Sequence, residues 1–106
     1  IDWEALHQVE PKILINGTPV GMHPNVDKSP FDKRRLHSTM IVFDTVYNPE
    51  STLLIKDARN AGAKVVTGVE MFVRQAAYQF KLFCGQEAPV QVMRDTLKRA
   101  IGAAKY

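Results

Sequence analysis

Short apolar segments alternate along this chain with longer segments of helical periodicity. The apolar segments are rich in β-branched residues and comprise residues 13–15, 40–46 and 64–67. Continuous runs of this kind are typical of strands that are covered on both faces. We therefore expect three strands, with helices after the second and the third.

Capping signals set the bounds of the first expected helix. Asn48 is placed to act as its N-cap, with Pro49 at the first helical position. The helix is expected to end at Ala61, because the following Gly62 suits a left-handed stop.

Two further helices are expected toward the end of the chain. Thr67 and Glu70 form a capping box that opens a helix over about 68–83, and this helix is expected to end near Gly85. Pro89 opens the last helix. One face of that last helix carries Val90, Met93, Leu97 and Ile101.

The alternation of strands and helices predicts an α/β fold with a parallel sheet and right-handed crossovers. Three strands make a thin sheet, since doubly wound domains usually hold about five or six. The pattern therefore resembles half of a doubly wound domain. The chain starts at Ile1 and not at Met, which fits a piece of a longer protein.

Composition narrows the possible functions. With 106 residues and 45% apolar residues, the chain is expected to form one globular domain, which excludes disorder. No apolar run approaches the roughly 20 residues that span a bilayer. A single cysteine, Cys84, cannot form an internal disulfide, which favours a cytoplasmic protein.

Charge and histidine placement do not predict a nucleic-acid or metal site. The net charge is +3, and its one dense cluster, "DKRR" at 32–35, suits a solvated loop better than a phosphate site. The three histidines are far apart and have no cysteine at zinc-ligand spacing. We therefore expect no metal and no nucleic-acid partner.

Residues that suit ligand binding follow all three expected strands. In open parallel sheets, ligands bind beyond the carboxyl ends of the strands. Residues 16–22, 44–48 and 67–68 follow these ends and are rich in Gly, Thr, Asn and Tyr. Gly68 would let a ligand approach free N–H groups at the positive end of a helix dipole. Ordinary turn chemistry is the alternative for each segment taken alone.

The helix over 68–83 carries two neighbouring stripes. Its expected core face consists of Phe72, Ala76, Ala77, Phe80 and Phe83. Beside it lie Met71, Gln75, Tyr78 and Leu82. The amide of Gln75 suits recognition of a hydroxyl or carboxylate, although a solvated surface glutamine is the simpler alternative. Arg74 follows Glu70 by four residues and is expected to form a helix salt bridge with it.

Three segments, in order, carry a resemblance to a known family. They read "INGTPVGMHPN", "IVFDTVYNPESTLL" and "AGAKVVTGVEMFVRQAAYQF". They are similar to the N-[AT]-T-[PS]-x-G-M loop, the strand ending D-x-x-Y-x-P and the G-x-x-M-[LF]-x-x-Q-A helix of shikimate dehydrogenases. From about residue 13 to 97, the chain resembles the C-terminal part of that family's cofactor domain. The form of the motifs is closest to dehydrogenases fused with 3-dehydroquinate dehydratase.

The resemblance implies a fold, an activity and a set of site residues. The family reduces 3-dehydroshikimate to shikimate with NADPH in aromatic amino-acid biosynthesis. Residues 1–88 would form the second half of a Rossmann-type doubly wound NADP-binding domain, and 89–106 a helix that packs toward a substrate domain. Substrate contacts would come from Tyr47 and Gln75. Cofactor contacts would come from Asn16, Thr18, Thr45, Gly68 and Met71.

The resemblance also sets limits. The family's catalytic Lys and Asp, its glycine-rich turn and its Asn-Arg-Thr motif for the 2′-phosphate have no counterpart here. We therefore expect this chain alone to be inactive and to self-associate through a strand edge or an exchanged helix. An NAD-using quinate/shikimate dehydrogenase and a non-catalytic α/β interaction domain remain as alternatives.

Overall fold

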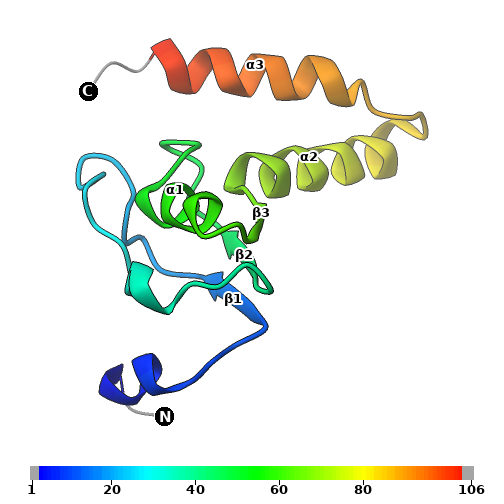
Figure 1. The fold of residues 1–106 in the computed structure, drawn as a ribbon. Helices are drawn as coiled ribbons and strands as arrows, with labels where there is room; N and C mark the ends of the chain where they lie inside the picture. Colours follow the sequence, from blue (N-terminus) through cyan, green and yellow to red (C-terminus); the bar gives the residue numbers. More distant parts are fainter. Residues whose placement is uncertain (1–2, 104–106) are drawn as a thin grey trace.

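A three-stranded parallel sheet forms the centre of the molecule, as seen in the computed structural model that describes residues 3–103 (Figure 1). The strands lie in the order β1 (Ile13–Asn16), β2 (Ile41–Asp44) and β3 (Lys64–Val66). The α-helices are α1 (Leu53–Asn60), α2 (Gly68–Cys84) and α3 (Val90–Ala103). Two short 3-10 helices, η1 (Trp3–Gln8) and η2 (Lys33–Arg35), complete the fold. The expected α/β class with three parallel strands and flanking helices is confirmed.

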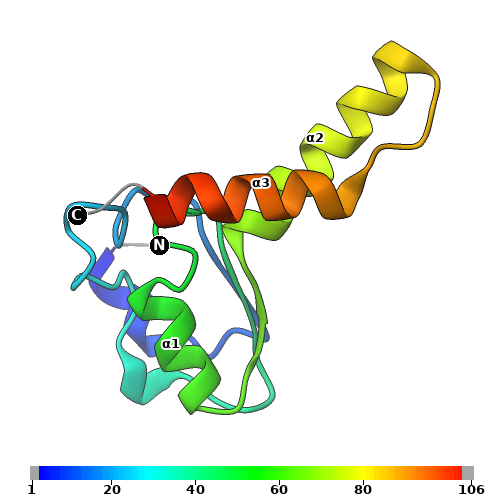
Figure 2. The same cartoon turned by 90° about the horizontal axis from the view of Figure 1, so that it is seen from above.

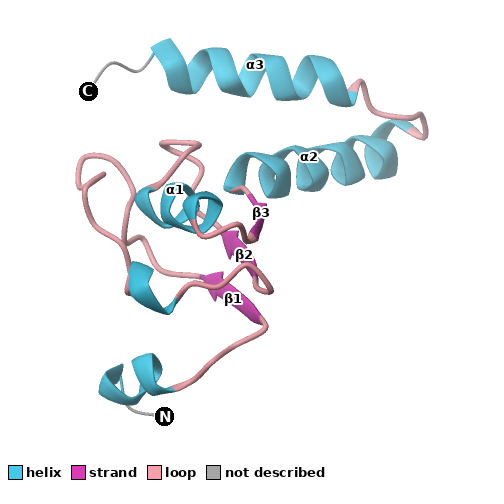
Figure 3. Ribbon diagram, viewed as in Figure 1, coloured by secondary structure: helices cyan, strands magenta, loops and turns pink. Residues whose placement is uncertain are grey.

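The core lies between the sheet and α1, which covers one of its faces (Figure 3). Val42 at the centre of β2 is fully buried there, and Leu54 and Ala58 of α1 pack against it. The loop between β1 and β2 closes the core with Phe31, Leu36 and Met40.

The other face of the sheet is largely exposed within the described residues. Parallel register places Ile15 beside Phe43 and Phe43 beside Val66. Ile15 is 59% exposed and Val66 40% exposed. The expectation of strands covered on both faces is therefore wrong for residues 3–103. The physical reason is that α2 and α3 pack mainly against each other and not on this face.

The start of α1 differs from the expected one. The N-cap is Thr52, whose hydroxyl oxygen accepts a hydrogen bond from the Ile55 N–H at 3.2 Å. The expected cap at Asn48 and the helical position of Pro49 are wrong, because the Asn48 carbonyl accepts from the His23 N–H at 2.9 Å and belongs to a loop. The helix ends as expected, and Gly62 adopts a φ of 81° after it.

Helix α2 has the expected bounds but not the expected buried face. Thr67 caps it, and Gly85 ends it with a left-handed φ of 69°. Its buried residues are Gly68, Val69 and Val73 near its start. Phe72 and Phe83, placed on the expected core face, are 39% and 87% exposed. That expectation is wrong because the second half of α2 projects away from the sheet (Figure 2).

Helix α3 folds back along α2, so the two helices form an antiparallel pair (Figures 1 and 2). The expected face of α3 is half-buried, and it consists of Val90, Met93, Leu97 and Ile101. None of the helices within residues 3–103 combines the length and the apolar character needed to cross a membrane.

Candidate functional site

The segments that follow β1 and β2 meet in an open groove at the carboxyl edge of the sheet. The groove has a volume of about 350 Å³ and is lined by Gly17, Thr18, Pro19, Met22, His23, Thr45, Val46, Tyr47 and Asn48. It therefore brings together Thr18, Thr45 and Tyr47 from two segments that are far apart in the sequence. The parallel strands cause this meeting, because they end at the same edge.

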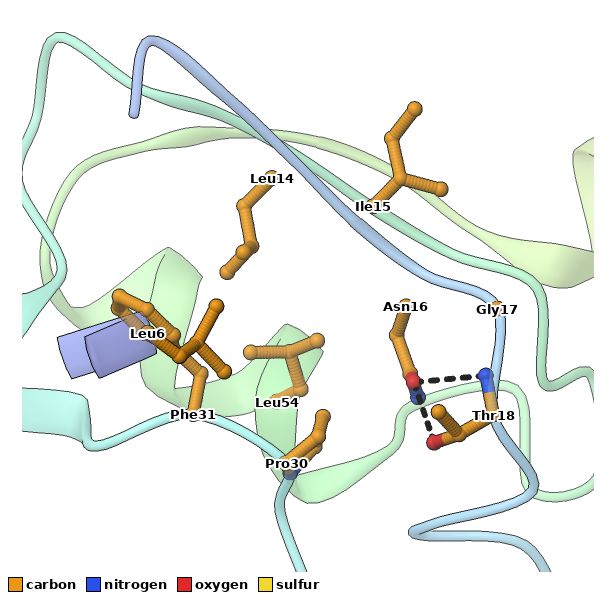
Figure 4. A pocket seen from close by; sticks show the side chains of 9 residues that line it. All are labelled: Leu6, Leu14, Ile15, Asn16, Gly17, Thr18, Pro30, Phe31 and Leu54. Carbon is orange, nitrogen blue, oxygen red and sulfur yellow. Dashed lines mark hydrogen bonds between the residues drawn. The ribbon is translucent and has the colours of Figure 1, made fainter. Parts of the chain in front are cut away.

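Asn16, at the end of β1, is buried, and both atoms of its side-chain amide form hydrogen bonds within the protein. Its Nδ2 donates to Asp44 Oδ1 at 3.1 Å and to the Val20 carbonyl at 3.1 Å. Its Oδ1 accepts from the N–H and the hydroxyl of Thr18 at 3.0 and 2.6 Å (Figure 4). Asn16 therefore shapes the loop after β1 with its side chain.

Asp44, at the end of β2, is the second buried polar residue of this edge. Its Oδ1 also accepts from the Val46 N–H at 3.0 Å, and its Oδ2 accepts from the Thr52 hydroxyl at 2.7 Å. Our sequence reasoning included Asp44 in the candidate segment 44–48 without giving it a role of its own, and it missed Thr52. The available signal was an acidic residue directly after the apolar run of β2, because a buried carboxylate requires hydrogen-bond donors.

Thr45 lies beside Asp44 and faces the opposite way, toward the groove. Its hydroxyl donates to the Asn16 carbonyl at 2.8 Å, and its N–H donates to the same carbonyl at 3.1 Å. The end of β1 and the first residue of the loop after β2 are thus tied to each other at the groove.

Gly68 has a packing role that its sequence position did not reveal. A Cβ at this residue would collide with the Val46 carbonyl and would lie 2.8 Å from the Thr45 carbonyl oxygen. Glycine therefore allows the first turn of α2 to contact the backbone of the loop after β2. This contact accounts for a glycine at position 68, and the expectation that Gly68 admits a ligand stays a prediction.

Tyr47 lines the groove, whereas Gln75 lies on α2 and outside the groove lining. The Tyr47 ring lies 5.0 Å from the Phe72 ring, centroid to centroid, at an angle of 58°. Gln75 is exposed and follows Phe72 by three residues, which places it on the same side of α2. Met71 is half-buried one turn before Gln75. Neither Met71 nor Gln75 lines the groove itself.

The start of α2 is also joined to α3 by charged side chains. The Glu70 carboxylate accepts from Arg94 at 2.8 Å through Nη2 and at 3.1 Å through Nε. These hydrogen bonds hold the pKa of Glu70 below its usual value. The expected Glu70–Arg74 pair is present at a longer 3.8 Å. The Glu70 carboxylate thus turns to Arg94 instead of closing the expected capping box with Thr67.

A smaller pocket lies on the α1 side of β1 (Figure 4). Its volume is about 140 Å³, and its lining is mainly apolar: Leu6, Leu14, Ile15, Asn16, Gly17, Thr18, Pro30, Phe31 and Leu54. Asn16 and Thr18 stand at its polar end and separate it from the groove. Over residues 3–103, no group of three His, Cys, Asp or Glu side chains is placed to hold a metal ion.

The basic cluster at 32–35 forms a surface turn. Asp32 caps η2 by accepting from the Arg34 N–H, and its carboxylate also pairs with the Arg34 guanidinium at 2.7 Å. The Arg34 side chain is 83% exposed, as the solvated-loop interpretation expects.

The chain is similar to proteins of known function over most of its length. Residues 68–98 match the sequence profile of the family described as Shikimate 5'-dehydrogenase C-terminal domain. The chain is 52% identical over 91 residues to an NADP(+) shikimate dehydrogenase of Methanosarcina acetivorans, covering 86% of this chain and 32% of that protein.

Solved structures agree with this similarity. A quinate dehydrogenase from Corynebacterium glutamicum in complex with NAD superposes with a TM-score of 0.83 at 36% identity, covering 91% of this chain and 34% of that one. A shikimate 5-dehydrogenase from Thermus thermophilus in complex with NADP(H) and shikimate gives 0.79 at 28% identity, covering 94% and 37%. The chain thus spans about a third of the length of the relatives that it matches.

Proposed function

We propose, from the confirmed relationship of this chain to the C-terminal part of shikimate dehydrogenases, that it forms part of an NADP-dependent shikimate dehydrogenase. The observation that carries the proposal is the 52% identity over 86% of the chain, which includes the three motifs. The parent enzyme would reduce 3-dehydroshikimate to shikimate. This chain would supply part of the nicotinamide and substrate sites, and the rest of the enzyme would supply the catalytic groups.

The groove at the carboxyl edge fits the nicotinamide end of the cofactor. It is open, and the part of its lining that Gly17, Thr18 and Thr45 form consists of small or short side chains. Thr18 and Thr45 would border the nicotinamide directly, while Asn16 and Gly68 would shape the walls behind them. Met71 would approach the same end from the first turn of α2. The cofactor supplies the hydride when it is bound.

Tyr47 and Gln75 are proposed to contact the substrate. Tyr47 is 39% exposed at the rim of the groove, and its ring rests on Phe72. Gln75 presents its amide one turn further along α2. A phenolic hydroxyl and a carboxamide together offer donors and acceptors that suit the hydroxyls and carboxylate of shikimate.

We further propose that residues 1–88 form the second half of the cofactor domain and that 89–106 form a helix that packs toward a substrate domain. The open face of the sheet and the exposed end of α2 support this division, because both present apolar side chains that a larger enzyme would cover. A cytoplasmic location is part of the proposal, and it rests on the single free cysteine, Cys84.

A second candidate is a quinate dehydrogenase that uses NAD. It is favoured by the similarity to the Corynebacterium glutamicum enzyme, which was solved with NAD. Steady-state rates of the parent enzyme with shikimate or quinate, each with NADP or NAD, separate the two candidates.

The test of the proposed substrate site is kinetic and uses the full enzyme that contains this chain. Gln75→Ala should reduce kcat/KM for shikimate by about 5- to 150-fold, the usual loss for a hydrogen bond to a bound polar group. The KM for NADP should change little. Tyr47→Phe should act in the same direction, since it removes only the phenolic oxygen.

Gln79→Ala is the matched control, because Gln79 is an exposed glutamine one turn further from the groove on the same helix. It should leave both parameters unchanged. If Gln75→Ala affects only NADP, or no more than Gln79→Ala does, the assignment of Gln75 to the substrate is wrong.

A further inference from the structure

We propose that Asp44 is the positioning residue of the cofactor groove: its carboxylate holds both binding loops and the start of α1 in one arrangement. This inference rests on the proposed function, because it concerns the same groove. It assigns a role to a buried ionisable side chain that no other part of the proposed reaction uses.

The contacts of Asp44 reach three separate segments. Oδ1 accepts from Asn16 Nδ2 at the end of β1 at 3.1 Å and from the Val46 N–H in the loop after β2 at 3.0 Å. Oδ2 accepts from the hydroxyl of Thr52, which caps α1, at 2.7 Å. Asp44 is fully buried, so these contacts replace water around the carboxylate.

The effect of Asp44 extends to groove residues that it does not touch. Asn16, fixed by Asp44 through its Nδ2, directs its Oδ1 to the N–H and hydroxyl of Thr18. On the other side, Val46 leads directly into Tyr47, and its carbonyl packs against Gly68. Loss of the carboxylate therefore loosens both walls of the groove together.

A carboxylate matches the groups that face this position. The three groups that face it are all donors: an amide NH₂, a backbone N–H and a hydroxyl. A carboxylate accepts hydrogen bonds through two oxygens, whereas an asparagine has one such oxygen, so the Thr52 hydroxyl would have to accept from its NH₂ instead of donating. Buried donors that lose their acceptor weaken the local structure.

Asp44→Asn in the full enzyme is the direct test. It keeps the shape of the side chain, and the Thr52 hydroxyl can turn to accept from the new NH₂, so the variant is expected to fold. We expect the KM for NADP to rise about 10-fold, the effect of weakening a hydrogen bond to a charged group, with a smaller change in kcat. Hydrogen exchange of the Val46 and Thr18 amides should become faster.

Val42→Ala is the control for a purely structural effect. Val42 is fully buried in the same strand, but it packs in the core and not at the edge. It should lower the melting temperature without raising the KM for NADP. The proposal would be overturned if Asp44→Asn and Val42→Ala lost equal stability and both raised the KM for NADP. An unchanged KM for NADP in Asp44→Asn would overturn it as well.

Thr52→Val provides a second variant, which removes the hydroxyl contact to Asp44 together with the N-cap hydrogen bond from the Ile55 N–H. It should raise the KM for NADP in the same direction but by a smaller factor, and it decides the question if Asp44→Asn does not fold. An unchanged KM in Thr52→Val would then count against the proposal. If the wild-type enzyme has no NADP-dependent or NAD-dependent activity, the proposed function itself fails, whereas wild-type activity with unaffected variants refutes only the role of Asp44.

Discussion

Gly68→Ala is predicted to destabilise the fold through a single added methyl group. The new Cβ would meet the backbone carbonyls of Val46 and Thr45, at 2.8 Å for Thr45 and still closer for Val46. Neither carbonyl can withdraw freely. The Thr45 N–H and hydroxyl are bonded to the Asn16 carbonyl, and the Val46 N–H is bonded to Asp44. The clash must therefore be relieved by moving α2 away from the loop.

The size of the effect follows from two opposing terms. Overpacking in a tightly packed site costs about 1–3 kcal/mol. The cost here should lie near the upper limit of about 3 kcal/mol, because the added methyl group meets backbone carbonyls that cannot move freely. Alanine recovers at most about 1 kcal/mol of helix propensity relative to glycine. The free energy of unfolding should thus fall by about 2 kcal/mol, which lowers the melting temperature of a domain of this size by about 8–16 °C.

Urea denaturation followed by circular dichroism measures this change. Gly17→Ala is the matched control, because a Cβ at Gly17 meets no heavy atom within 4 Å and Gly17 is not among the glycines with positive φ. It should change the free energy of unfolding by less than about 0.5 kcal/mol. If Gly68→Ala is as mild as Gly17→Ala, the tight contact between α2 and the loop after β2 does not exist in solution.

Three further outcomes are expected. The isolated chain should show no dehydrogenase turnover with shikimate and NADP, because the groove holds only part of a site; turnover above the blank would contradict this. The chain should self-associate with increasing concentration in sedimentation velocity, since Ile15 and Phe83 are 59% and 87% exposed; a clean monomer would contradict it. Arg94→Ala should make the free energy of unfolding, measured by urea denaturation at several pH values, fall less as the pH is lowered. The lowered pKa of Glu70 contributes stability above its usual pKa that is lost as the pH falls through the lowered value, and an unchanged dependence would refute this.

Local signals in the sequence were enough to predict most elements. The β-branched runs gave the three strands, and Thr67 with Gly85 gave both ends of α2, because caps and left-handed glycines act within one turn of chain. The start of α1 could not be predicted in this way. Thr52 caps the helix while its hydroxyl is held by Asp44, eight residues away, and only the folded chain shows that contact.

The buried face of α2 was a different kind of error. Helical periodicity shows that Phe72, Phe80 and Phe83 share a side, but it does not show what lies against that side. Within the described residues, α3 packs along α2 near Phe72, and Phe83 remains exposed beyond it. An apolar stripe on a helix therefore predicts burial only where a partner element is known.

The residues of the candidate site show why sequence alone does not distinguish residues that shape a binding groove from residues that contact the ligand. Asn16 and Gly68 are the residue types expected beside a cofactor, yet the structure uses the amide of Asn16 to hold a loop and the bare backbone of Gly68 to pack a helix. Thr18 and Tyr47 then line the groove that this packing creates. The residues that shape a groove and those that face it are neighbours in the same motif. Substitution of a residue that shapes the groove should lower stability and cofactor affinity together. Tyr47→Phe, which keeps the ring against Phe72, should change kinetics alone.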